Sequence, residues 1–268
     1  MKTKKAKGIG YGKVILFGEH FVVYGLPAIA SAIASKTIAV AEPFEGKGLY
    51  IDDKRDASPS YKEEKLDQQQ KSLFNILNAS GIVSNDNPVK VTLSGDLVAA
   101  SGVGASAASC VAIARALSDY FDLGFDDDKI NEIAYEGEKG YHGTPSGIDN
   151  TVATYGGLIW FKKGTPPTMD LIKMKKPVGI IMADTGIAAN TSKVVAAVKE
   201  RKEKDPAKYD KIFKHYQGLI NKAKKALEDS DVKTIGSLMD ENHKLLQQIE
   251  VSCKELLEKL VVLEQFFA

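Results

Sequence analysis

The segment SAASCVAIARALSDYFDL, at residues 106–123, constrains the fold of this chain more than any other. Almost all of its side chains up to Leu117 are small or apolar, so a helix formed here has no polar face wide enough to meet solvent. The pattern therefore predicts a helix that is buried on most of its sides. The chain must provide other elements to cover it.

A glycine-rich loop stands directly before this helix. In SGVGASAAS, residues 101–109, Gly102 and Gly104 precede a first turn made of Ser and Ala. Free backbone N–H groups and the positive end of the helix dipole converge there, and no side chain blocks them. The segment is predicted to be an anion cradle. The alternative is a loop of small residues that lets helices pack closely.

Two familiar phosphate-binding motifs are matched only in part. Gly102, Gly104 and Ala107 satisfy G-x-G-x-x-A, but the dinucleotide-binding turn leaves its strand at once, and LSGDLVAA intervenes here. GIGYGKV, near the N-terminus, resembles a Walker A loop only superficially, since Lys7 stands where the first glycine is required and Val14 where Ser or Thr would bind Mg²⁺. The first match is weak and the second is rejected.

The remaining pattern predicts an α+β chain. Runs of β-branched, aromatic or alternating apolar residues predict strands at 14–17, 21–24, 37–42, 89–95, 156–161 and 177–186. Apolar residues at helical spacing predict helices at 63–80, 106–123 and 129–140, and almost throughout from Thr191 to the end. The turn signals GTPP and KKP predict a domain boundary near 165–178, which divides the chain into residues 1–176 and 177–268.

Composition narrows the classes of partner. Lys and Arg number 36 and Asp and Glu 35, so no excess positive charge is present to hold nucleic acid or an anionic membrane. No run of about 18 apolar residues occurs, and no apolar stretch follows the basic N-terminus. The two cysteines, Cys110 and Cys253, are too few for a disulfide framework. We expect a cytosolic protein with a small-molecule partner, and a homodimer is left open.

A second polar segment, EGEKGYHGTPSGIDN, holds two carboxylates eleven residues apart. Glu138 and Asp149 flank a loop that contains two glycines and a proline, and such a loop can bring them together. One carboxylate can then ligate a divalent cation while the other accepts a proton from a hydroxyl, as phosphoryl transfer requires. Structural alternatives remain: Glu138 as a solvated residue at a helix end, and Asp149 as a helix N-cap or Asx-turn residue.

A third segment, KVILFGEHFVVYG, sets Lys13, Glu19 and His20 around a strand that is interrupted at Gly18. Polar groups beside a kinked buried strand predict the edge of a pocket. The alternatives are a lysine that extends its amine to solvent and a histidine satisfied within the core. His142, His215 and His243 lack the spacing of a zinc site.

These three segments, in this order, resemble the GHMP family of small-molecule kinases. GKVILFGEHFVVYG, SGVGASAAS and HGTPSGIDNTVATYGG carry the resemblance, which extends over residues 8–160. It implies a two-domain kinase fold, with a mixed α/β N-terminal domain that binds ATP and a helix-rich, ferredoxin-like C-terminal domain. Within the family the segments are most similar to members that phosphorylate the primary hydroxyl of mevalonate. A phosphomevalonate, homoserine or sugar kinase is the alternative.

The resemblance also implies a role for each candidate residue. Asp149 would be the base that faces the acceptor hydroxyl, and Lys13 would neutralise charge on the transferred phosphoryl group. Ser106 and Glu138 would ligate Mg²⁺. The substrate end of the site would hold Glu19, His20 and Thr191. The loop that wraps the triphosphate of ATP would consist of Gly102, Val103, Gly104, Ala105, Ser106 and Ala107.

The chain departs from the family pattern in two places. DLVAA replaces the proline that usually precedes the loop glycines, and Ala105 replaces the first of two serines, while Ser106 is retained. Family members also carry a third glycine-rich segment near the C-terminus, and no glycine follows Gly236 here. The resemblance therefore implies an incomplete C-terminal domain and a chain that is marginally stable and a poor catalyst. A non-catalytic, truncated paralogue is the alternative.

Overall fold

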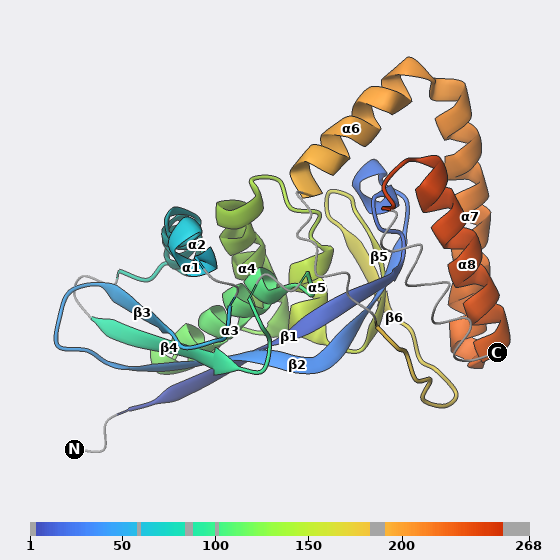
Figure 1. The fold of residues 1–268 in the computed structure, drawn as a ribbon. Helices are drawn as coiled ribbons and strands as arrows, with labels where there is room; N and C mark the ends of the chain where they lie inside the picture. Colours follow the sequence, from blue (N-terminus) through green and yellow to red (C-terminus); the bar gives the residue numbers. More distant parts are fainter. Residues whose placement is uncertain (1–3, 58–59, 84–87, 100–101, 183–190, 254–268) are drawn as a thin grey trace. The chain divides into compact units, whose positions relative to one another are not determined.

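The computed structural model describes residues 4–57, 60–83, 88–99, 102–182 and 191–253 (Figure 1). It divides the chain into two compact units. Unit 1 consists of residues 1–15 and 30–159, and unit 2 of residues 16–29 and 160–268. The segment 16–29 thus belongs with the C-terminal part of the chain by its contacts, which the periodicity of the sequence did not reveal. The domain boundary at residue 176 stays a prediction.

Six strands form one mixed sheet. The strands β3, β4, β2, β5 and β6 lie in that order, and β1 pairs with β2. The pair β2–β4 is antiparallel and aligns Thr37 with Gly95, whereas β3 runs parallel to β4. The strands are β1 (Ala6–Phe17), β2 (Ala28–Pro43), β3 (Leu49–Asp53), β4 (Val89–Gly95), β5 (Leu158–Lys162) and β6 (Thr168–Leu171).

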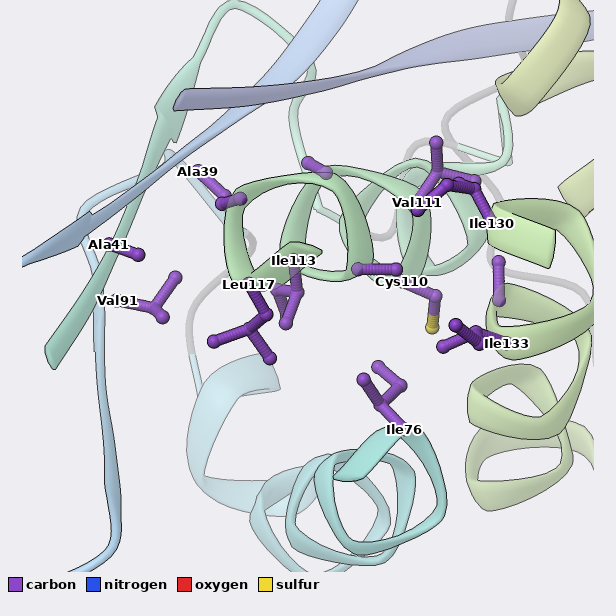
Figure 2. Packing of buried hydrophobic residues seen from close by; sticks show 14 of the residues in the cluster. Ala39, Ala41, Ile76, Val91, Cys110, Val111, Ile113, Leu117, Ile130 and Ile133 are labelled. Carbon is purple, nitrogen blue, oxygen red and sulfur yellow. The ribbon is translucent and has the colours of Figure 1, made fainter. Parts of the chain in front are cut away.

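The helices of unit 1 gather on one face of its strands (Figure 1). They are α1 (Tyr61–Glu64), α2 (Leu66–Ser80), α3 (Ala105–Tyr120), α4 (Asp127–His142) and α5 (Ile148–Tyr155). The helix α3 lies at the centre, and twelve of its sixteen residues are buried. Figure 2 shows Val111, Ile113 and Leu117 of α3 among side chains from the sheet and from α2 and α4. The prediction of a helix buried on most sides is confirmed.

Two glycines of β1 allow α3 to approach the sheet. A Cβ atom at Gly8 would stand 2.0 Å from the carbonyl oxygen of Ala112, and one at Gly10 would stand 2.1 Å from that of Ala108. Real Cβ atoms are not found at such distances from backbone oxygens, so any larger residue would push the helix away. The glycines of GIGYGKV therefore have a packing role, in agreement with the rejection of a Walker A loop.

Unit 2 is mainly helical. Its helices are the short 3₁₀ helix η1 (Phe21–Tyr24), α6 (Thr191–Lys204), α7 (Pro206–Asp229) and α8 (Val232–Gln248). The helices α7 and α8 pack side by side (Figure 1). Both begin at an aspartate whose side chain accepts a hydrogen bond from a backbone N–H of the first turn, as N-cap residues do. No helix in the described ranges combines the length and the apolar character that crossing a bilayer requires.

Two predicted strands of unit 2 are wrong. Residues 21–24 form η1 instead, because the segment turns between Gly18 and Gly25, which both have positive φ angles, and places Phe21 against Tyr216 of α7. Residues 177–182 form no strand, and Ile181 is 70% exposed. A strand needs a neighbour for its backbone hydrogen bonds, and none of the described strands pairs with this segment. The rest of the predicted strand, 183–186, lies outside the described residues.

Candidate active site

The glycine loop ends at the first turn of α3. Gly104 is the N-cap residue, with a left-handed φ of 77°, and no side chain caps the N–H groups of that turn. The backbone N–H of Lys13 donates to the carbonyl oxygen of Val103 at 2.8 Å, which attaches the loop to β1. Ala105 and Ala107 are buried, and the side chain of Ser106 is half-buried. The arrangement leaves donor groups at the positive end of a helix dipole, where an anion binds favourably.

An ion pair lies against this loop. Lys13 Nζ is 2.9 Å from Asp149 Oδ1, and both side chains are largely shielded from solvent. A Cβ atom added to Gly104 would stand 2.9 Å from Lys13 Cγ and 3.7 Å from Asp149 Oδ1. Only glycine therefore lets the loop approach the pair this closely. Of the two alternatives for Asp149, the N-cap is excluded because Gly147 occupies that position of α5.

The position of Asp149 depends on the residue that follows it. Asn150 is buried, and its Nδ2 donates to the backbone oxygen of Asn131 at 3.2 Å and to its Oδ1 at 2.6 Å. Thr151 donates its hydroxyl to the carbonyl oxygen of Gly147 at 2.6 Å. These bonds attach the first turn of α5 to α4 and close it on itself. Asp149 is consequently presented by a rigid turn.

Glu138 is the most buried carboxylate of the site. It stands in the last turns of α4 and is 1% exposed, which excludes the alternative of a solvated residue. Burial raises the pKa of Glu138 to about 8, and the charge of Asp149 adds to this rise. A side-chain hydrogen bond with Ser106 and the charge of Lys13 act in the opposite direction. Ser106 and Glu138, which the resemblance assigns to the same Mg²⁺, therefore lie within hydrogen-bond reach of each other.

A residue to which the sequence assigned no role also lies here. His142 Nε2 is 3.3 Å from Ser106 Oγ and 3.9 Å from Glu138 Oε2. Burial lowers the pKa of His142. Its place four residues after Glu138 was the available signal, because residues at that spacing share one face of a helix. The spacing alone could not identify Ser106 as the partner of His142.

The donor set at this place fits Mg²⁺. A hydroxyl and a carboxylate oxygen are ligands of the kind Mg²⁺ takes, and it usually keeps several waters and phosphate oxygens besides one or two protein ligands. Among the residues described, no group of three or more His, Cys, Asp or Glu side chains could hold a metal ion. Ser106 and Glu138 are thus suited to a cation that arrives with a phosphate ligand.

A cavity opens beside the start of α3. It measures about 110 Å³ and is lined by Ala105 and Ser106 together with residues from β3, α1, α2 and α4. Arg55 forms part of its wall and is 6% exposed. Its Nη1 donates to Ser109 Oγ at 2.5 Å and to the carbonyl oxygen of Ala105 at 3.3 Å, while its Nη2 pairs with Asp53 at 2.7 Å. The sequence showed no motif around Arg55, so it was missed.

Glu19 and His20 belong to unit 2. Glu19 is exposed. His20 has a left-handed φ of 64°, which is uncommon for a residue other than glycine, and its buried Nδ1 has no hydrogen-bond partner among the described residues. Burial lowers the pKa of His20, and the charge of Arg201 adds to this while Glu19 opposes it. His20 thus combines a strained backbone with a buried nitrogen that has no partner among the described residues.

Tyr216 of α7 holds the turn that carries His20. Its hydroxyl donates to the carbonyl oxygen of Pro27 at 2.7 Å, and its ring stacks on Phe21 with 4.0 Å between centroids. A Cβ atom on Gly18 would stand 2.6 Å from this hydroxyl. Thr191 is the first residue of α6, as predicted, but its side chain lies outside the described part of the chain.

Comparison with known proteins identifies the family. The model of the GHMP kinases N terminal domain matches residues 70–157. The mevalonate kinase of Pyrococcus abyssi is 31% identical over 265 residues, which cover 92% of this chain and 78% of that protein. The chain belongs to the GHMP kinase family. It is therefore a small-molecule kinase, and kinases of this family use ATP.

Solved structures of GHMP kinases agree with the fold. The crystal structure of L. major mevalonate kinase in complex with R-mevalonate is 40% identical with a TM-score of 0.85, covering 94% of this chain and 78% of that one. A galactokinase of Lactococcus lactis in complex with galactose has a TM-score of 0.66 at 16% identity, which shows the shared fold alone. The residues matched by the family model include Ser106, Glu138 and Asp149 but not Lys13.

Proposed function

We propose that this chain transfers the γ-phosphoryl group of ATP to the primary hydroxyl of mevalonate and so forms 5-phosphomevalonate. The observation that carries the proposal is the Lys13–Asp149 ion pair at 2.9 Å, which lies against Gly104 of the anion cradle. The choice of mevalonate is supported by the L. major enzyme, crystallised with R-mevalonate, at 40% identity.

The phosphate chain of ATP binds at the loop from Gly102 to Ala107, where uncapped N–H groups face it. Asp149 accepts the proton of the acceptor hydroxyl as that oxygen bonds to phosphorus and the bond to the leaving ADP oxygen breaks. Lys13 holds the carboxylate of Asp149 in place through their ion pair, and its ammonium offsets the negative charge that spreads over the phosphoryl oxygens. Both groups are held by rigid elements, β1 and the first turn of α5, so little reorganisation is required.

Ser106 and Glu138 are proposed to hold Mg²⁺. An ion held by these two side chains would offset negative charge on the phosphates of ATP. The burial of Glu138 suits this role, because a carboxylate with few water contacts gains most from a cation beside it. A protonated Glu138 must lose its proton before it ligates the ion.

The acceptor is proposed to bind with Glu19, His20 and Thr191. His20 carries the best support, since its buried Nδ1 lacks a partner among the described residues and its strained backbone is fixed by the turn from Gly18 to Gly25. A hydroxyl or carboxylate of the acceptor would provide the missing hydrogen bond. The base of ATP is assigned to the cavity beside Arg55, because that cavity begins at Ala105 and Ser106 of the phosphate loop.

A coupled assay of ADP release against four alcohols tests the proposal. The candidates are R-mevalonate, phosphomevalonate, homoserine and galactose, each with ATP and Mg²⁺. We expect the ratio kcat/KM to be highest for R-mevalonate by at least ten-fold. A higher value for another alcohol would replace mevalonate as the substrate but keep the assignment as a kinase, and release of ADP with none of them would contradict the proposal.

A cytosolic location and a homodimer are further expectations. The homodimer is checked by sedimentation.

A further inference from the structure

We propose that His142 is a positioning residue for the cation site: it orients the hydroxyl of Ser106 so that one lone pair of that oxygen faces the cation. This inference rests on the proposed function, because it assumes that Ser106 and Glu138 hold a divalent cation. The geometry is direct. His142 Nε2 lies 3.3 Å from Ser106 Oγ, and the same nitrogen lies 3.9 Å from Glu138 Oε2.

The placement follows from the helix. Glu138 and His142 stand four residues apart in α4, so their side chains emerge on the same face. Ser106 approaches that face from the first turn of α3. The imidazole nitrogen therefore reaches both of the oxygen-bearing side chains that the proposed function assigns to the cation. Within the part of the chain that the structure describes, no other histidine forms a hydrogen bond or an ion pair with either of them.

Hydrogen-bond accounting sets the direction of each bond. A serine hydroxyl has one proton to donate and two lone pairs that accept. Glu138 is hydrogen-bonded to Ser106, and as an ionised ligand it can only accept, so the hydroxyl proton points to Glu138. The bond between Ser106 and His142 must then be donated by Nε2–H of the imidazole. One lone pair of Ser106 Oγ remains for the cation, and the two hydrogen bonds of the hydroxyl fix the direction of that lone pair.

Without His142 the hydroxyl keeps its bond to Glu138 but can rotate its lone pairs about that bond. The cation would then have to order the hydroxyl as it binds, and its affinity would fall. Groups that orient metal ligands in this way commonly change metal affinity about 10- to 100-fold when they are removed. His142 is half exposed, with 52% of its side chain accessible, so its replacement leaves no cavity in the core.

Three variants test the inference. His142→Ala removes the donor, while His142→Gln retains an N–H donor at a similar reach along the side chain. Ser106→Ala removes the group on which His142 acts. The binding of Mn²⁺, used as a paramagnetic substitute for Mg²⁺, is measured by electron paramagnetic resonance in the presence of a saturating, non-hydrolysable ATP analogue. The affinity for the same analogue in EDTA is measured in parallel.

We expect His142→Ala to weaken Mn²⁺ binding roughly ten-fold, His142→Gln to restore it within about two-fold, and analogue binding in EDTA to stay unchanged. In the Ser106→Ala background, His142→Ala should have no further effect, because a residue that acts through Ser106 has nothing left to orient. In steady-state assays, His142→Ala should raise the Mg²⁺ concentration needed for half-maximal turnover more than it lowers kcat.

Two results would overturn the inference, and they can be told apart from a failure of the proposed function. If His142→Ala binds Mn²⁺ normally, or weakens it equally with and without Ser106, then His142 does not act through Ser106. If Ser106→Ala and Glu138→Gln themselves leave Mn²⁺ binding unchanged, the proposed cation site is wrong and the role of His142 falls with it. In that second case the transfer to mevalonate is still judged by its own assay.

Discussion

Asp149, which forms an ion pair with Lys13, is the residue proposed to accept the proton of the acceptor hydroxyl. Asp149→Asn keeps the size of the side chain but cannot accept the proton of the acceptor hydroxyl. We expect turnover to fall by roughly two to four orders of magnitude, the usual contribution of a general base, while the nucleotide stays bound by the loop. Steady-state kinetics and titration with a fluorescent ATP analogue measure the two quantities.

Asp210→Asn is the matched control for this variant, because Asp210 is exposed on α7 and has no assigned role. It should leave both quantities unchanged. If Asp149→Asn turned over at the normal rate, Asp149 would not be the base.

Glu138 is expected to make the free energy of unfolding of the protein depend on pH. Its pKa of about 8 in the folded chain exceeds the ordinary value of 4.5, so between these values the folded state holds a proton that the unfolded state has released. The stability contributed by this proton is fully present below about pH 4.5 and is lost as the pH rises through about 8. The free energy of unfolding of the protein without nucleotide and cation should therefore fall over this range.

Urea unfolding at several pH values between 5 and 8 tests this expectation. Glu138→Gln removes the titrating group and should flatten the fall, whereas Glu64→Gln, at an exposed position of α1, should follow the unmodified protein. Equal pH slopes for the unmodified protein and for Glu138→Gln would show that Glu138 is not protonated in the folded state.

At the scale of elements, the glycine loop offers a pair of matched substitutions. Gly102 and Gly104 both have left-handed φ angles, 74° and 77°, and an alanine in that region costs about 1 to 2 kcal/mol. A Cβ atom at Gly102 meets no atom within 4 Å, whereas one at Gly104 stands 2.9 Å from Lys13 Cγ. Gly104→Ala should therefore lower the free energy of unfolding more than Gly102→Ala, as urea denaturation would measure. Equal losses would mean that Lys13 moves aside freely.

The turn that carries His20 depends on Tyr216. Tyr216→Phe removes the hydroxyl that satisfies the buried carbonyl of Pro27, and an unsatisfied buried group of this kind costs about 1 to 3 kcal/mol. We expect a lower melting temperature and a higher KM for the acceptor, with the KM for ATP unchanged. Tyr50→Phe, at an exposed position of β3, is the control for both measurements. A normal acceptor KM for Tyr216→Phe would separate the turn from acceptor binding.

The elements that the sequence predicted well are those whose pattern is local. Short stretches of sequence were enough to predict α3 from its apolar run and α4 from the helical spacing of its apolar residues. The glycines before α3 likewise predicted a loop that ends at the N-terminus of a helix. Residues 21–24 have the β-branched and aromatic character of a strand, yet their packing on α7 decides their structure. Tertiary contacts of this kind override local preference and cannot be counted from one sequence.

The candidate site could be predicted from the sequence only in part. Lys13, Ser106, Glu138 and Asp149 stand in recognisable segments, and the structure brings them together in unit 1. Arg55 and His142 were missed because each is defined by partners distant along the chain: Arg55 by Ala105 and Ser109, and His142 by Ser106. No pattern within a short window could connect them.

At the scale of the whole molecule, composition excluded classes of partner and motif order suggested the family, but neither could divide the chain. The segment 16–29 lies within the first 30 residues and still belongs to unit 2, since Phe21 and Pro27 are held there by Tyr216. A chain that passes from one unit to another and back leaves no change in composition at the crossing. The expectation of an incomplete C-terminal domain stays a prediction.

This chain is proposed to phosphorylate the primary hydroxyl of mevalonate with Asp149 as the base. The most direct measurement is phosphorus and carbon NMR of the product formed from ATP, Mg²⁺ and R-mevalonate labelled with ¹³C at C5. We expect a new phosphomonoester signal coupled to the labelled C5, formed by the unmodified protein and at least about a hundred-fold more slowly by Asp149→Asn. Phosphate on any other carbon, no phosphorylated product, or an equal rate with Asp149→Asn would contradict it.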